Sequence, residues 1–257
     1  MSIGGPFRAL GTAIRTLTIL PCPGREAASL ASALPWFPCV GLLIGAGLVF
    51  IGWVIGGLVD WPLGAAAVAV AWMAWVTGGL HLDGLADTVD GLAGGRTRER
   101  ALEIMKDSRV GALGAIALAV VLLLKVIAVA RLVELQTWRW LPVPVILARL
   151  AQVQLSVALP YARAEGGTAS AFVRESGLGA YAVAAISAMV LCALLADFAG
   201  IAAWLAATGV AVVIGAGMRR RLGGVTGDVL GYASEMTEAL LFIAFAIAAS
   251  AWHARRW

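Results

Sequence analysis

Long runs of apolar residues, separated by short polar segments, are the dominant pattern along the chain. A bilayer core about 30 Å thick needs roughly 20 apolar residues for each helix that crosses it. Seven runs approach this length, and each predicts a spanning helix: 40–59, 61–80, 110–130, 141–159, 178–196, 200–217 and 239–252. The last run is the shortest, and it is also compatible with a helix lying in the membrane interface. We therefore predict an all-α, polytopic transmembrane bundle of about seven spans.

Composition narrows the class of protein further. Of the 257 residues, 61% are apolar and 13% are charged, against about 25% charged in an average soluble domain, and the mean hydropathy is +0.91. These values exclude a water-soluble globule and a disordered chain. Cys22, Cys39 and Cys192 have no paired spacing, so we expect them to be reduced and to bind no metal. Because no repeat is visible, residues 1–257 are predicted to form one integral-membrane domain.

The distribution of Lys and Arg predicts the orientation of the bundle. With the N-terminus in the cytoplasm, 13 of these 19 residues fall in cytoplasmic segments, four fall on the other side, and Lys125 and Arg149 fall within spans. The outer four are Arg131, Arg139, Arg255 and Arg256. The positive-inside bias therefore predicts a cytoplasmic N-terminus, with residues 1–39 cytoplasmic or interfacial. Lys125 is expected to snorkel toward one membrane face, whereas Arg149 needs a partner or a wet cavity.

The segment 81–109, between the second and third runs, carries three aspartates. Asp83, Asp87 and Asp90 would lie within an arc of about 60° on an α-helix, which turns about 100° per residue. Like charges on one helix face repel each other, so the arrangement indicates a bound cation. Oxygen donors without cysteine favour Mg²⁺ or Mn²⁺. The simpler interpretation is a solvated acidic helix start stabilised by the helix dipole, but ionisable groups at a membrane boundary favour a functional role.

Basic residues follow the aspartates before the third run begins. Lys106 and Arg109 suit phosphate oxygens, Arg109 through two parallel contacts. His81 lies about 160° from Asp83 on an ideal helix, which makes it a weaker candidate for contacting substrate. The loop around Arg163 is charge-balanced and is interpreted as solvated.

A second polar segment, 218–238, follows the sixth run. Gly223 and Gly224 would let the backbone approach a ligand closely, and Thr226 lies in the same loop. If the chain is helical from Asp228, Glu235 shares a face with it. The predicted topology places this segment on the same side of the membrane as segment 81–109, so the two are expected to converge.

Three long motifs together identify a known family. GGLHLDGLADTVDGL, IMKDSRVGALG and RRRLGGVTGDVLGYASEMTE occur in this order. The chain thereby closely resembles the cobalamin synthase family, which is the adenosylcobinamide-GDP ribazoletransferase family. The resemblance implies an Mg²⁺-dependent integral protein of the bacterial cytoplasmic (inner) membrane. Its implied reaction joins adenosylcobinamide-GDP to α-ribazole or α-ribazole 5′-phosphate and releases GMP, within the nucleotide-loop assembly of vitamin B12.

The resemblance and the residues suggest one mechanism. A hydroxyl of α-ribazole would attack the phosphorus next to the cobinamide arm while carboxylate-bound Mg²⁺ neutralises charge. Asp83, Asp87 and Asp90 are assigned as metal ligands, and Asp228 and Glu235 as catalytic residues that complete the site or accept a proton. Substrate binding is assigned to His81, Lys106, Arg109, Gly223, Gly224 and Thr226. Asp90 is the first choice for the general base, followed by a released aspartate, Asp107, Glu238 or His81.

Two other functions fit part of the pattern. A CDP-alcohol-type membrane phosphotransferase also uses an aspartate-rich face near the membrane, although the later motifs disfavour it. A cation-coupled transporter would place acids near the middle of its spans and would show two repeated halves. The expected partners are the two substrates and the lipid bilayer, without nucleic acid. A homo-oligomer, or association with other cobalamin-pathway enzymes, is compatible with the sequence.

Overall fold

The computed structural model describes residues 4–167 and 169–254, which are mostly helical and contain no β-strand. Arg255 and Arg256, used in the charge count, lie outside these ranges. The α-helices are α1 (Gly4–Leu17), α2 (Phe37–Ile51), α3 (Pro62–Val76), α4 (Leu80–Gly94), α5 (Arg98–Ile104), α6 (Ala112–Glu134), α7 (Pro142–Ala158), α8 (Ser170–Arg174), α9 (Leu178–Leu222) and α10 (Gly227–Ala254). Two short 3-10 helices, η1 (Leu30–Trp36) and η3 (Trp138–Trp140), and one π-helical segment, η2 (Gly52–Leu58), complete the helical elements of this part of the chain. The predicted all-α class is confirmed.

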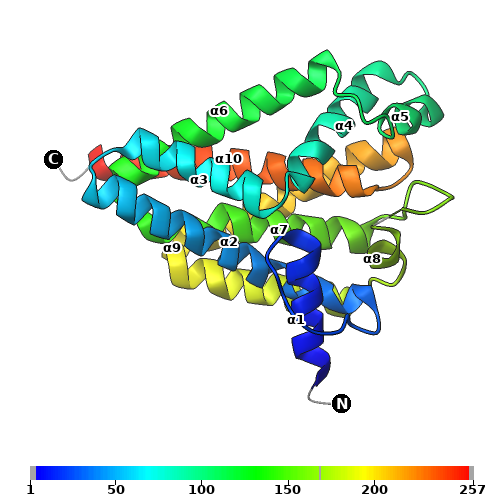
Figure 1. Cartoon of the computed structure of the whole chain (residues 1–257), viewed down its shortest axis with the longest axis horizontal. Helices are drawn as coiled ribbons and strands as arrows, with labels where there is room; N and C mark the ends of the chain where they lie inside the picture. The colour runs from blue at the N-terminus through cyan, green and yellow to red at the C-terminus, as the bar shows by residue number, and fades with distance from the viewer. Residues whose placement is uncertain (1–3, 168, 255–257) are drawn as a thin grey trace.

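Helix α7 is the centre of the bundle. Of its 17 residues, 14 are buried, and it packs against α2, α9 and α10. Figure 1 shows the long helices running side by side along the longest axis, with α7 in their midst. The outer helices instead expose large apolar side chains; on α6 these include Leu113, Ile116 and Leu123. An apolar exterior around a packed interior is the arrangement expected of a bundle surrounded by lipid.

Five helical segments are long and apolar enough to cross a membrane, or six if α3 and α4 together form one bent span. This number is lower than the seven predicted runs for two reasons. The second run is shorter than predicted, because α3 ends at Val76. The fifth and sixth runs lie in one helical segment, α9. The seventh run, predicted to be the least secure, is part of the 28-residue helix α10 and is long enough to span.

Helix α9 folds back on itself. Its backbone leaves helical geometry at Ala196 and Asp197, and Asp197 adopts a positive φ of 51°. The two arms then pack together, since the indole nitrogen of Trp204 donates to the carbonyl oxygen of Ala185 at 3.1 Å. A Cβ at Gly200 would lie 1.9 Å from the carbonyl oxygen of Cys192, so only glycine fits at this contact. The turn predicted between the fifth and sixth runs is therefore present.

The break between α3 and α4 directs the acidic segment. Gly78 and Gly79 both have positive φ angles, 60° and 72°, a conformation that glycine adopts without a Cβ penalty. The two helices consequently meet at 86°. The diglycine at the start of the first motif thus turns the chain sharply before the first aspartate.

Polar segments gather at one end of the bundle. Figure 1 shows α4, α5 and α8 at the end opposite the C-terminus, and we call this the polar end. Helix α1 lies across the direction of the long helices at the same end. The chain after α1 is fixed to the bundle by the amide of Ile19, which donates to the carbonyl oxygen of Val76 at 2.8 Å.

Candidate active site

Helix α4 presents its aspartates beside the first turn of α10. Asp83 is exposed, whereas Asp87 and Asp90 are half-buried. Between them, Gly84 touches the backbone of Asp228, because a Cβ at Gly84 would lie only 2.6 Å from that carbonyl oxygen. The absence of a side chain at position 84 therefore lets α4 and α10 cross closely. The predicted convergence of the two polar segments is confirmed for Asp228.

The acids of this region influence one another electrostatically. These acids lie on or beside helix α4, which is too short to cross a membrane by itself. Burial, and then the charges of Asp83, Asp228 and Asp90, raises the pKa of Asp87 to about 7. Like charges that are brought together in this way disfavour one another's ionised form.

The aspartates do not form a ready-made metal cage. Within residues 4–167 and 169–254, no three His, Cys, Asp or Glu side chains are grouped closely enough to hold an ion. Mg²⁺, however, usually keeps several waters and binds proteins through one or two carboxylates together with substrate phosphates. The exposed Asp83 and the neighbouring Asp87 fit that mode of binding. They do not fit an all-protein site.

Asp90 is engaged by the start of α6. Its carboxylate accepts hydrogen bonds from the amides of Gly111 at 2.7 Å and Gly114 at 2.8 Å. A Cβ at either glycine would lie within 2.5 Å of an Asp90 carboxylate oxygen, so both positions require glycine. A negative charge at a helix N-terminus is stabilised by the helix dipole. Asp90 therefore joins α4 to α6, and its assignment as metal ligand and base stays a prediction.

Asp228 is held by a residue that the sequence analysis interpreted as solvated. Arg163 places its guanidinium 2.8 Å from Oδ2 of Asp228, in a partly buried ion pair. Val225 positions the loop that carries Arg163. Its amide donates to the carbonyl oxygen of Pro160, and its carbonyl oxygen accepts from the amide of Ala162, so that the two segments form an isolated parallel β-bridge. The only sequence feature pointing to this contact was the placement of both loops on one side of the membrane.

The loop before α10 is held by contacts within the protein, and the substrate-binding assignments of Gly223, Gly224 and Thr226 stay predictions. Gly223 ends α9 with a left-handed φ of 75°. A Cβ at Gly224 would lie 2.1 Å from the carbonyl oxygen of Pro160, so its backbone approaches the neighbouring loop closely. Thr226 is fully buried; its hydroxyl accepts from the amide of Val229 and donates to Asp228. The hydroxyl of Thr226 therefore helps to fix the carboxylate of Asp228, and its contact with substrate stays a prediction.

Glu235 is engaged in a buried ion pair inside the bundle, and its catalytic assignment stays a prediction. Helix α10 continues straight from Asp228 into the bundle, so Glu235 is buried there and accepts a hydrogen bond from Lys125 at 2.6 Å. Glu238 accepts from Lys125 at 2.5 Å and from Arg149 at 2.9 Å. Lys125 therefore does not snorkel, since it is only 2% exposed. Arg149 has the partner that its position requires.

Lys106 and Arg109 lie in the connection between α5 and α6, and each is paired with an exposed acid. Lys106 forms an ion pair with Glu165. Arg109 bonds Asp107 at 2.6 Å and holds the pKa of that carboxyl down at about 2. Among the described residues these cations pair with Glu165 and Asp107 and with none of the α4 aspartates, so their role in phosphate binding stays a prediction.

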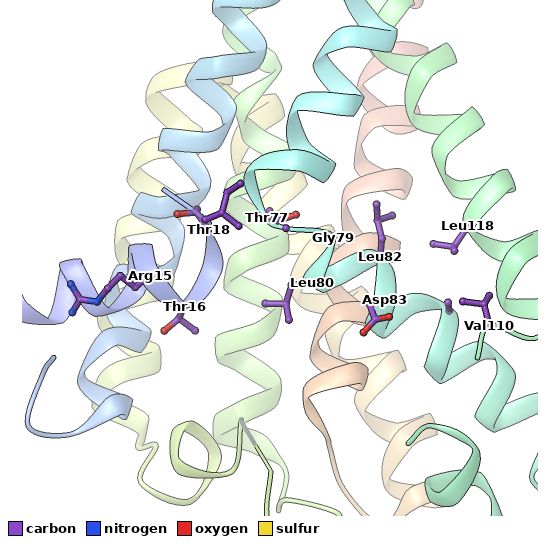
Figure 2. Close-up of a pocket in the computed structure, with 13 residues that line it drawn as sticks. Arg15, Thr16, Thr18, Thr77, Gly79, Leu80, Leu82, Asp83, Val110 and Leu118 are labelled. Atoms are coloured by element: carbon purple, nitrogen blue, oxygen red, sulfur yellow. The ribbon is translucent and has the colours of Figure 1, made fainter. Parts of the chain in front are cut away.

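Two cavities meet at Asp83. The larger, about 610 Å³, lies between the end of α1, the α3–α4 turn and the start of α6. Figure 2 shows Leu80 and Asp83 pointing to one side of α4 and Leu82 to the other, with Arg15 and Thr16 contributed by α1. The smaller cavity, about 230 Å³, is lined by Asp83, Asp228 and the buried His81. The acids thus border space that ligands can enter.

Comparison with known proteins identifies the family. The family model described as cobalamin-5-phosphate synthase matches residues 9–246. The chain belongs to this family. The resemblance that the three motifs predicted is therefore confirmed, and all three motifs lie within the matched residues. No solved structure matches the chain.

Three similar curated proteins of the cobalamin-5-phosphate synthase family are each named adenosylcobinamide-GDP ribazoletransferase. The protein from Chlorobium chlorochromatii (strain CaD3) is 49% identical over 243 residues, covering 93% of this chain and 95% of its own. Those from Chlorobaculum tepidum and Chlorobaculum parvum are each 45% identical, over 93% and 91% of this chain and 94% of their own. The relatives are thus transferases that align over nearly their whole length.

Proposed function

We propose that this chain is an adenosylcobinamide-GDP ribazoletransferase of the bacterial cytoplasmic membrane, with its polar end in the cytoplasm. The observation that carries the proposal is the near full-length similarity to proteins of that name. The acidic region beside two cavities supports it, because transfer of a phosphoryl group needs developing negative charge to be neutralised. The concentration of basic residues in polar-end segments supports the orientation.

The proposed reaction replaces the phosphoanhydride bond of the diphosphate by a phosphate ester bond. A hydroxyl of α-ribazole, or of its 5′-phosphate, forms a bond to the phosphorus that carries the cobinamide arm. The bond from this phosphorus to the bridging oxygen of the diphosphate breaks, and GMP leaves with that oxygen. The hydroxyl proton passes to a carboxylate of the site. The products are adenosylcobalamin, or its 5′-phosphate, and GMP.

Bound Mg²⁺ would supply charge neutralisation for the diphosphate. We assign Asp83 and Asp87 to hold it, with phosphate oxygens as further ligands, and we keep Asp90 as a third ligand to be tested. Asp228 is suited to accept the hydroxyl proton, because Arg163 and Thr226 both bond its Oδ2 and fix the side chain. Its Oδ1 accepts no hydrogen bond from the residues that the structure describes. Lys106 and Arg109 are assigned to the phosphates.

Product analysis by mass spectrometry tests the proposed function. The purified chain in lipid nanodiscs should convert adenosylcobinamide-GDP and α-ribazole to adenosylcobalamin and GMP in equal amounts. Chelation of divalent ions should stop the reaction. Release of CMP from a CDP-alcohol, without GMP from adenosylcobinamide-GDP, would overturn the proposal in favour of a CDP-alcohol phosphotransferase.

A further inference from the structure

The smaller cavity is enclosed mainly by apolar side chains from distant parts of the chain. Leu17 of α1, Phe37 of α2, Phe172 of α8 and Leu230 of α10 all line it. The rings of Phe37 and Phe172 lie 5.9 Å apart between centroids and are tilted by 56°. An aromatic pair of this kind presents a broad apolar surface to a ligand.

Three buried polar side chains line the same cavity, and each has at least one polar atom without a partner, although the amide nitrogen of Gln152 donates to the carbonyl oxygen of Leu230 at 3.5 Å. Neither ring nitrogen of His81, nor Oε1 of Gln152, nor Oγ of Ser156 has a hydrogen-bond partner among the described residues. Their exposed fractions are 2%, 3% and 1%. Unpaired polar atoms in an interior cost free energy, and nearly all buried ones are satisfied. Three of them around one cavity indicate a ligand that completes their hydrogen bonds.

The size and lining of the cavity restrict what this ligand can be. A volume of about 230 Å³ is below the roughly 300–1,000 Å³ of pockets that enclose whole drug-sized ligands. It therefore admits one ring system and excludes a corrin. Guanine carries polar atoms on nearly every edge, and the aromatic side of the cavity, formed by Phe37 and Phe172, would leave the atoms that face it unpaired. The base of α-ribazole, a methylated benzimidazole, has apolar edges and a ring nitrogen that accepts a hydrogen bond.

We propose that this cavity binds the benzimidazole base of α-ribazole and selects the nucleoside substrate. The inference rests on the proposed function. Phe37 and Phe172 contact the ring system. The ring nitrogen accepts a hydrogen bond from the hydroxyl of Ser156 or a ring N–H of His81, and Oε1 of Gln152 accepts one from a hydroxyl of the attached ribose. Asp83 and Asp228 line the same cavity. A base held there places the attached ribose, and hence the attacking hydroxyl, beside the acids.

Equilibrium binding tests the inference without catalysis. The full chain in nanodiscs is titrated with α-ribazole alone and, separately, with GDP. Gln152→Leu and Ser156→Ala should each weaken α-ribazole binding by about 5- to 10-fold, the loss expected for one hydrogen bond, and should leave GDP binding unchanged. Gln154→Leu is the matched control. Gln154 lies on the same helix and also has an unpartnered Oε1, but its amide bonds Thr208 of α9 and it does not line the cavity.

Steady-state kinetics separates this inference from the proposed function. The KM for α-ribazole should rise in both cavity variants while the KM for adenosylcobinamide-GDP stays within about twofold of wild type. Unchanged α-ribazole binding in Gln152→Leu and Ser156→Ala would overturn the inference, and so would weakened binding of GDP instead. Both results leave GMP release by the wild type intact. Absence of GMP release by the wild type would instead overturn the proposed function. Ser156→Ala removes a single oxygen and keeps the test valid if Gln152→Leu fails to fold.

Discussion

Individual aspartates of α4 are held in different ways, although their spacing is regular. Asp83 is exposed at the junction of two cavities, whereas both amide contacts of Asp90 tie it to the start of α6. The sequence predicted their common face, because helix geometry depends only on spacing. It could not predict which carboxylate an adjacent helix N-terminus would engage, since that depends on tertiary packing.

Substitution of Asp83 or Asp87 should abolish turnover. Asp83→Asn and Asp87→Asn each keep the size of the side chain but remove a charge that would hold the metal, so we expect kcat to fall by about 100-fold or more. GMP release by each purified variant measures the effect. Asp60→Asn is the control, because Asp60 is an exposed turn residue with a φ of 55° that asparagine tolerates. A variant of Asp83 or Asp87 with near wild-type kcat would remove that residue from the site.

Arg163 should matter through Asp228. Arg163→Met removes the guanidinium that fixes Oδ2, so we expect kcat to fall by about 10- to 100-fold with a small change in either KM. Arg174→Met is a suitable comparison, because Arg174 bonds only a nearby backbone carbonyl and is exposed. Equal kinetics in the two variants would contradict a positioning role for Arg163.

At the scale of elements, glycine positions explain much that hydropathy could not. Hydropathy predicted the helices of the bundle because burial in lipid requires long apolar runs. It extended the second predicted span to residue 80, past the end of α3 at Val76. Gly78 and Gly79 count as apolar in a hydropathy average, but their positive φ angles break the helix. Gly223 and Gly224 were predicted to contact a ligand, because glycine lets the backbone approach another group closely. The sequence shows that a close approach is allowed there, but not what approaches.

The crossing of α4 and α10 should depend on Gly84. Gly84→Ala would place a Cβ 2.6 Å from the backbone of Asp228, which should lower the free energy of unfolding by about 1–3 kcal/mol and reduce kcat. Thermal unfolding in detergent, together with GMP release, measures both effects. Gly209→Ala is the control, because Gly209 is a helical glycine with open space around its Cβ position. Alanine there should be neutral or stabilising, and comparable losses in the two variants would contradict the packing argument.

At the scale of the whole molecule, buried charges hold α6, α7 and α10 together away from the acidic region. Lys125, Arg149 and Glu238 come from these three helices and bond one another in the interior. Glu235, which also pairs with Lys125, adds the second negative charge, so two positive and two negative charges compensate, as buried ionic groups require. The sequence revealed that Arg149 needs a partner, but not which one, because the partner lies 89 residues away. A cation-coupled transporter would also carry charged residues within its spans. Here those charges are explained by ion pairs that join the helices.

Removal of the buried cation should destabilise the bundle. Lys125→Met leaves Glu235 without its partner, so the free energy of unfolding should fall by about 3–5 kcal/mol. Arg131→Met is the matched control on the same helix, because it removes only a half-exposed ion pair with Glu134 and a partly buried hydrogen bond to Ser250, which together should contribute less than about 2 kcal/mol. Thermal unfolding of both variants checks the difference. Similar midpoints would show that the interior pair is not what stabilises the bundle.

The central claim is that Asp83 and Asp87 share a divalent ion with the substrate diphosphate, and Mn²⁺ binding tests it most directly. Electron paramagnetic resonance would measure Mn²⁺ affinity of the purified chain in nanodiscs with adenosylcobinamide-GDP present. Affinity should fall at least tenfold in Asp83→Asn and Asp87→Asn and should be unchanged in Asp60→Asn. Equal affinity in the wild type and all three variants would contradict the account.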